Sequence, residues 1–151
     1  MLEWLIPDFD GYRMLGHLRD LLLAYLLAIP SAWGREARNR AVGLRTFPLV
    51  AVAACGYALI GFSILESADA HARIMQGLIT GIGFIGGGAI LKNGGSVQGT
   101  ATAASLWATG AIGLSVAAHR FEIAVLLSIA TFLTLRYLKP LMNVAKESSD
   151  S

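Results

Sequence analysis

Five apolar segments follow one another along the chain, separated by short polar stretches. They cover residues 14–33, 47–65, 74–91, 102–118 and 121–138. A bilayer core about 30 Å thick is crossed by roughly 20 helical residues, which is close to the length of each segment. The pattern predicts an all-α membrane protein, a compact bundle of about five transmembrane helices. Because the connecting stretches are short, consecutive helices are expected to be antiparallel neighbours.

Glycine is concentrated in the third and fourth segments. In a bilayer, small residues four positions apart let two helices approach closely, because little else draws apolar helices together there. Such helix-packing positions are Gly77, Gly81, Gly83, Gly87 and Gly88, with Ala104 and Ala108 at the same spacing in the fourth segment. The spacing predicts that the third and fourth helices pack tightly and that copies of the chain form a homo-oligomer. A soluble pair of glycine-rich strands is disfavoured, since the apolar runs are nearly unbroken.

The polar ends divide the chain into three parts. Residues 1–13 carry Glu3, Asp8 and Asp10 rather than a basic start, so we expect a short interfacial segment and no cleaved signal peptide. Residues 14–140 form the predicted transmembrane domain. Residues 141–151 are polar and are expected to be a cytoplasmic tail.

The positions of Lys and Arg predict the orientation in the membrane. With the 34–46 connection in the cytoplasm, that side holds eight of the twelve basic residues and the other side holds four. Because cytoplasmic loops carry the excess of basic residues, the N-terminus is expected outside and the C-terminus inside.

Composition agrees with a membrane location and argues against nucleic-acid binding. The 151 residues are 55% hydrophobic and 15% charged, with a net charge of +2 and a mean hydropathy of +0.60. Nucleic acid is not an expected partner, since no clustered basic face on a soluble domain is present. The single Cys55 lies in an apolar run and is expected to be buried in packing.

Asp20 is the candidate functional residue of the first segment. Spanning the full bilayer draws Arg19 and Asp20 into the outer third of the membrane, where ionisable groups are costly. Asp20 either faces the bundle interior and binds a proton, a cation or an arginine of another helix, or extends with Arg19 to the headgroups. Pro30, further along, is expected to bend or end the helix near Ser31.

The first cytoplasmic connection is rich in arginine. A helical turn would place Glu36 beside Arg40, so Glu36 is expected to organise the loop. The same arginines can simply anchor the chain to anionic lipid of the bilayer.

The second cytoplasmic connection, residues 92–101, contains Lys92, Ser96, Thr100 and Thr102 around several glycines. These residues fit either a pocket for an anion at a helix start, or a tight turn with an N-cap at Thr100 or Thr102. Trp107 lies in mid-span and is expected to pack against the small residues of the third helix. No metal site is expected, because Glu66, Asp69 and His71 share an exposed outer loop, and no cofactor is implied.

Two blocks of the sequence resemble the membrane domain of the MgtC/SapB family. They are GREARNRAVGLRTFPLV and GLITGIGFIGGGAILKNGGSVQGTATAASLWATGAIGL, and the resemblance covers residues 14–138. It maps the family's acidic-arginine segment onto Arg35, Glu36, Arg38 and Arg40, and the GLRT segment onto residues that include Arg45 and Thr46. We expect a membrane domain without the soluble C-terminal domain that many members carry.

The resemblance implies a role rather than a reaction. It implies a non-enzymatic bacterial inner-membrane protein linked to magnesium limitation and intracellular survival, with a membrane-protein partner such as the F-type ATP synthase. The alternative is a small ion or solute transporter or channel that uses Asp20 and the polar cytoplasmic loops. An intramembrane enzyme lacks support, because no Ser/His or paired-carboxylate arrangement falls at one level of the bundle.

Overall fold

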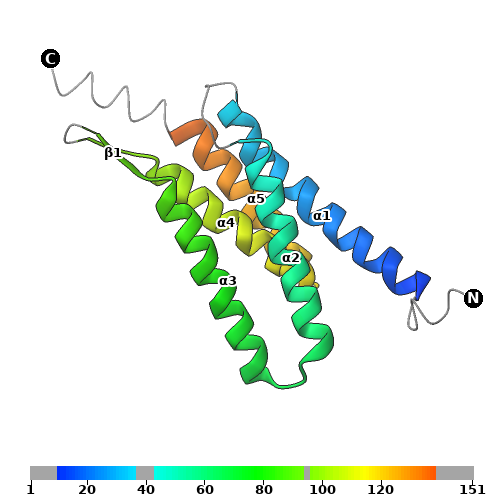
Figure 1. The fold of residues 1–151 in the computed structure, drawn as a ribbon. Helices are drawn as coiled ribbons and strands as arrows, with labels where there is room; N and C mark the ends of the chain where they lie inside the picture. Colours follow the sequence, from blue (N-terminus) through cyan, green and yellow to red (C-terminus); the bar gives the residue numbers. More distant parts are fainter. Residues whose placement is uncertain (1–9, 37–42, 94–95, 139–151) are drawn as a thin grey trace, which may run out of the picture.

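Five α-helices form an antiparallel bundle (Figure 1). The computed structural model describes residues 10–36, 43–93 and 96–138. The helices are α1 (Gly11–Glu36), α2 (Thr46–Ile64), α3 (Ala68–Gly88), α4 (Thr100–Ala117) and α5 (Phe121–Leu133), and a π-helical turn, Thr134–Leu138, continues α5. The predicted five-helix architecture is confirmed, with helix ends that differ by a few residues.

A short β-hairpin marks one end of the bundle. Strands β1 (Leu91–Asn93) and β2 (Ser96–Gln98) pair antiparallel, with Lys92 opposite Val97. Because the helices alternate in direction, the C-termini of α1, α3 and α5 lie at this same end as the N-termini of α2 and α4 (Figure 1). We call it the hairpin end.

The hairpin replaces the loop expected over 92–101, and its exit into α4 depends on Gly99. Gly99 has a φ of 91°, a left-handed conformation that other residues rarely adopt. A side chain there would also collide with the carbonyl oxygen of Ala89. Gly99 is the N-cap of α4 and no side chain caps the helix. The N-cap predicted at Thr100 or Thr102 is therefore wrong.

Helix α4 is the centre of the bundle and packs against each of the other four helices. The main core is built from small side chains rather than large ones, so the helix axes can lie close together. It contains Ala24, Ala28, Ala51, Cys55, Ala58, Ile112, Val116, Ala117 and Ala124. The prediction that Cys55 is a buried packing residue is confirmed.

Helix α1 continues through its proline. Pro30 was expected to bend the helix or to end it near Ser31, but the helix runs on to Glu36. The proline has no N–H to donate to Leu26, so one helical hydrogen bond is missing there. One residue on, the carbonyl of Leu27 accepts a hydrogen bond from the Ser128 hydroxyl of α5 at 2.6 Å. This contact joins α1 to α5 beside the proline.

Helix α3 begins earlier than its apolar segment. Ser67 is the N-cap, and its hydroxyl accepts a hydrogen bond from the Ala70 amide at 3.2 Å. Asp69 in the first turn is favourably placed near the positive end of the helix dipole. The polar residues 68–73, expected to belong to a loop, therefore form the first turns of α3.

Length and hydropathy single out two helices as able to cross a membrane. They are α2, with a mean hydropathy of 2.0 over its most apolar window, and α4, with 1.2. Helices α1 and α3 have the length but carry more polar residues, and α5 is 13 residues long before its π-helical turn. Five antiparallel helices are thus shown, and two of them qualify as membrane spans by composition.

Candidate functional site

Asp20 lies inside the bundle, with only 2% of its surface exposed. Its carboxylate accepts hydrogen bonds from the neighbouring Arg19, at 2.8 Å from Nη2 and 2.9 Å from Nε. The Arg19 side chain is more than half exposed, and its guanidinium carbon lies 6.0 Å from the ring centre of Phe121. Asp20 therefore faces the interior, as one of the two interpretations expected, but its partner is the adjacent arginine rather than one on another helix.

A buried row of hydroxyl groups follows α4. Thr102, Ser105 and Thr109 are all buried on the same side of the helix. The Thr109 hydroxyl donates to the Ser105 carbonyl at 2.8 Å, and the Ser105 hydroxyl donates to the Ala101 carbonyl. Donation to the preceding turn lets these hydroxyls lie in an apolar interior at little cost.

One further hydroxyl, on α1, lies inside the bundle. Ser31 is 1% exposed, and its Oγ has no hydrogen-bond partner among the described residues. Near this end of the bundle a second small core, made of Ala32, Phe47 and Leu106, brings α1, α2 and α4 together.

The candidate residues of the first connection are only partly described. Arg35 and Glu36 are the last two residues of α1, so the helix extends into the predicted loop. Arg38 and Arg40 lie outside the described residues, so the pairing of Glu36 with Arg40 stays a prediction.

Three basic side chains are exposed at the hairpin end. Arg45 precedes α2, Lys92 lies on β1, and Arg136 lies in the π-helical turn. Within the described ranges none of the three forms an ion pair. Ser96 pairs with Asn93 across the hairpin, and Thr100 is exposed in the first turn of α4. The sequence-predicted polar residues thus share one end of the molecule, and an anion pocket among them stays a prediction.

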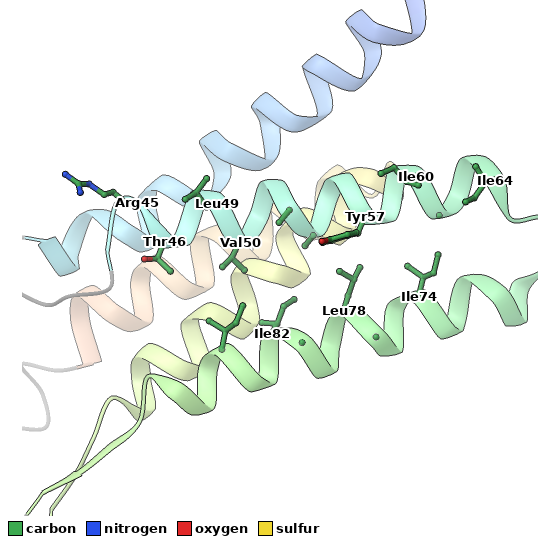
Figure 2. Close-up of a pocket in the computed structure, with 16 residues that line it drawn as sticks. Arg45, Thr46, Leu49, Val50, Tyr57, Ile60, Ile64, Ile74, Leu78 and Ile82 are labelled. Carbon is green, nitrogen blue, oxygen red and sulfur yellow. The ribbon is translucent and has the colours of Figure 1, made fainter. Parts of the chain in front are cut away.

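An open apolar groove of about 740 Å³ runs between α2 and α3 (Figure 2). Arg45 and Thr46 lie at its hairpin end, and Ile64 and Ile74 lie towards the other end (Figure 2). Gly77 and Gly81 contribute to the α3 wall. The groove follows the length of α2, which is about 28 Å for 19 residues at 1.5 Å per residue.

The predicted packing glycines of α3 do not make the contact with α4. All five are exposed, and a methyl group built on any of them would meet no atom within 4 Å. The contact is made instead by Gly86, which lies against Ala103, and by Gly110, which accommodates the side chain of Ile82. The prediction that Gly77, Gly81, Gly83, Gly87 and Gly88 pack α3 onto α4 is therefore wrong within one chain. Their role in self-association stays a prediction.

Trp107 is also placed differently from the expectation. It is 55% exposed, so it does not fill the space between α3 and α4. Ala104 is exposed and Ala108 partly exposed, which places this face of α4 towards the outside as well. The small-residue spacing identified the correct helices but the wrong faces.

Sequence reasoning missed Gly113, Gly110 and Ser128. The backbone of α2 crosses α4 at Gly113, where a methyl group would collide with the carbonyl oxygen of Ala51. The spacing of Gly110 and Gly113, three apart on one face, was an available signal. Ser128 is a lone hydroxyl in an apolar helix, and only the fold reveals its acceptor on α1.

Side chains that could hold a metal ion are not grouped in the part of the chain that the structure describes. In the three described ranges, no group of three or more His, Cys, Asp or Glu side chains is placed to hold a metal ion. His71 instead contacts the Leu65 carbonyl, with Nε2 at 2.7 Å from the oxygen, and packs edge-on against Phe62. What the arrangement offers is a buried acid, a basic end and exposed apolar surfaces.

Comparison with known proteins gives a consistent result. The family model described as "MgtC family" matches residues 21–144. A protein named Protein MgtC from Brucella abortus is 37% identical over 135 residues, which is 88% of this chain and 56% of the relative. Protein MgtC from Salmonella typhimurium is 37% identical over 116 residues, 77% of this chain and 49% of the relative. An uncharacterized protein from Synechocystis is 38% identical over 125 residues.

The chain spans about half the length of the relatives that it matches. No solved structure matches it.

Proposed function

The chain belongs to the MgtC family, and from this premise we propose that it is a non-enzymatic, multi-pass protein of the bacterial cytoplasmic membrane that acts by binding other membrane proteins. The observation that carries the proposal is the exposed glycine surface of α3. Five glycines with open space around them cost helix stability, about 0.5–1 kcal/mol each relative to alanine in a soluble helix. In a bilayer, such a surface is suited to close contact with another helix.

The distribution of charge supports the membrane location. Arg45, Lys92 and Arg136 are exposed at the hairpin end, whereas the opposite end carries both acids and bases. A basic end is what the cytoplasmic face of a membrane protein requires. The apolar character of α2 and α4 supports the same proposal.

A transporter or channel is the second candidate, and the buried Asp20 is the observation that favours it. However, the buried side of α1 continues from Asp20 through Ala24, Ala28 and Ala32, whose side chains offer no polar group to an ion, and only the Ser31 hydroxyl interrupts this apolar side in the described part of the helix. The Asp20 carboxylate is also already paired with Arg19. These features favour a structural ion pair over a conduction path.

The two candidates are separated by a flux measurement. Purified protein and its Asp20→Asn variant are placed in liposomes, and entry of Mg²⁺ and of protons is followed with entrapped dyes. We expect no flux above that of protein-free liposomes from either protein. Flux from the wild type that the variant loses would instead establish transport through Asp20.

Partner binding is tested in native membranes from cells grown at low magnesium, the condition that the family resemblance implies. The protein is crosslinked, purified under denaturing conditions, and its partners are identified, with the F-type ATP synthase as the first candidate. The Gly83→Leu/Gly87→Leu variant is expected to lose the partner, because both changes add bulk to an exposed face of α3. Ala130→Leu, a small-to-large change at an exposed site of α5, is the matched control and should retain it. Equal capture by both variants would place the partner elsewhere.

A further inference from the structure

One side of α3 combines open glycines with unpaired charges. At about 100° per residue, positions four apart drift slowly around a helix and form a single stripe. Steps of three or four residues along α3 connect six exposed residues, which we call the α3 face: Asp69, Arg73, Gly77, Gly81, Phe84 and Gly88. Gly77 and Gly81 also form part of the wall of the α2–α3 groove (Figure 2).

The charges of the α3 face have no partner within the described chain. Asp69 and Arg73 are one helical turn apart and exposed, yet neither forms an ion pair with a described residue. Each therefore presents an accessible charge without an ion-pair partner among the described residues, at the same end of the helix and away from the hairpin end.

Phe84 is the large apolar side chain of the same face. It is 85% exposed, with Gly81 three residues before it and Gly88 four residues after it. Both glycines leave open space where a side chain would be. The α3 face thus carries an exposed aromatic ring at Phe84, with open space at the glycines one helical turn before and after it.

We propose that two copies of this chain form a parallel, two-fold symmetric dimer through the α3 face. In a parallel symmetric helix pair, residue i of one copy lies near the same residue of the other copy and near its residues i±3 and i±4. Asp69 of each copy then lies near Arg73 of the other, which gives two ion pairs from one contact. Phe84 of each copy packs over Gly81 and Gly88 of the other. The face is thus complementary to itself in charge and in shape.

The glycine spacing also sets the geometry of the pair. Small residues four apart are typical of right-handed crossings of about −40°, in which helix backbones approach closely. Gly77 and Gly81 are four apart, and a Cβ added to either meets no atom within 4 Å. Because they also line the groove, the second copy's α3 would cover its open side. Lipid chains could contact the glycines, but they would leave Asp69 and Arg73 unpaired.

This inference rests on the proposed membrane location of α3, so the test begins with carbonate extraction of membranes. Recovery in the soluble fraction would overturn the proposed function. Disulfide crosslinking is then scanned along α3 in the Cys55→Ala background. Gly77→Cys, Gly81→Cys and Phe84→Cys are expected to form dimers efficiently. Ile79→Cys and Gly83→Cys, which lie off the α3 face, should do so at least fivefold less. A membrane-embedded protein that crosslinks equally at all five positions, or at none, would overturn only the dimer.

Charge exchange tests the pairing itself. Asp69→Arg and Arg73→Asp, made singly, should each raise the dimer dissociation constant about tenfold, because like charges then face each other twice. The double variant Asp69→Arg/Arg73→Asp restores opposite charges across the axis and should return the constant to within about threefold of the wild type. If the double variant instead raised the dissociation constant by the product of the two single effects, the ion pairs would not form.

A bulk substitution checks the interface independently of charge. Gly81→Ile should abolish the dimer, whereas Gly83→Ile, an equally open glycine of the same helix outside the α3 face, should leave it intact. Both proteins should melt at temperatures close to that of the wild-type monomer, since a Cβ at either position meets no atom of its own chain within 4 Å. Dimer retained in Gly81→Ile would overturn the proposal.

Discussion

Gly113 lies where α2 and α4 are in direct backbone contact. A methyl group at this position would collide with the Ala51 carbonyl oxygen and would lie about 3.0 Å from the Cys55 amide nitrogen. Neither atom belongs to a flexible side chain, so the collision can be relieved only by moving a helix. By contrast, the clash at Gly110 involves the end of the Ile82 side chain, which can turn aside more readily.

At this position we predict that Gly113→Ala lowers the free energy of unfolding by about 1–3 kcal/mol, the usual cost of overpacking a tight core. The change is measured as a lower melting temperature of the purified protein in detergent. Gly83→Ala is the matched control, because it also replaces a helical glycine but meets open space. It should melt at the wild-type temperature or slightly above. Equal melting of the two variants would show that the helices can separate at Gly113 without cost.

At the scale of the element, α1 shows how a helix tolerates an internal proline. Pro30 leaves the carbonyl of Leu26 without its usual donor, and a serine of another helix bonds to the next carbonyl. The hydrogen bond from Ser128 therefore links the weakened part of α1 to α5. The described structure shows α1 continuing to Glu36 rather than stopping at the proline.

We predict that Ser128→Ala lowers the free energy of unfolding by about 1 kcal/mol, because a buried hydrogen bond between two helices is lost and the Leu27 carbonyl loses its extra donor. Ser115→Ala is the control, since the Ser115 hydroxyl bonds to Ala111 within its own helix at 2.7 Å. Thermal melting should separate the two variants. If Ser115→Ala is the more damaging, the α1–α5 contact is not important for stability.

The elements differ in how far sequence predicts them. Long apolar segments and short connections were enough for five antiparallel helices, because the length of an apolar segment indicates the length of its helix. The strands of the hairpin are three residues each and carry no periodic signal long enough to identify them. The spacing of small residues along a helix also predicts which of them share a face, but it does not predict which neighbour packs against that face. For that reason the glycines of α3 and Trp107 were assigned to an internal contact, and the burial of Asp20 was left open.

At the scale of the whole molecule, charge and core lie in different places. The basic residues at the hairpin end are exposed, the opposite end carries mixed charges, and the alanine-rich core around α4 lies between them. This arrangement agrees with a protein that is oriented by its basic end in a membrane.

The orientation is tested with single cysteines in the Cys55→Ala background. Glu66→Cys lies beyond α2 at the end opposite the hairpin, and Lys92→Cys lies on the hairpin itself. We expect a membrane-impermeant maleimide to label Glu66→Cys in intact spheroplasts, and Lys92→Cys only after the membrane is permeabilised. The reverse order of labelling would contradict the proposed orientation, and labelling of both without permeabilisation would contradict a spanning bundle.

The alanine core also determines which genetic changes the protein can accept. In a core of large side chains, damaging substitutions mostly remove volume, and a cavity is the usual defect. Here the buried positions on α1, α2 and α5 are mainly alanines in helix-to-helix contact, so there is little volume to remove and almost none to add. In a library that substitutes every position, we therefore expect larger side chains in the core to be more damaging than smaller ones. Enlargement of buried alanines by one or two carbons would be selected against, while truncation of many outward leucines would pass unnoticed.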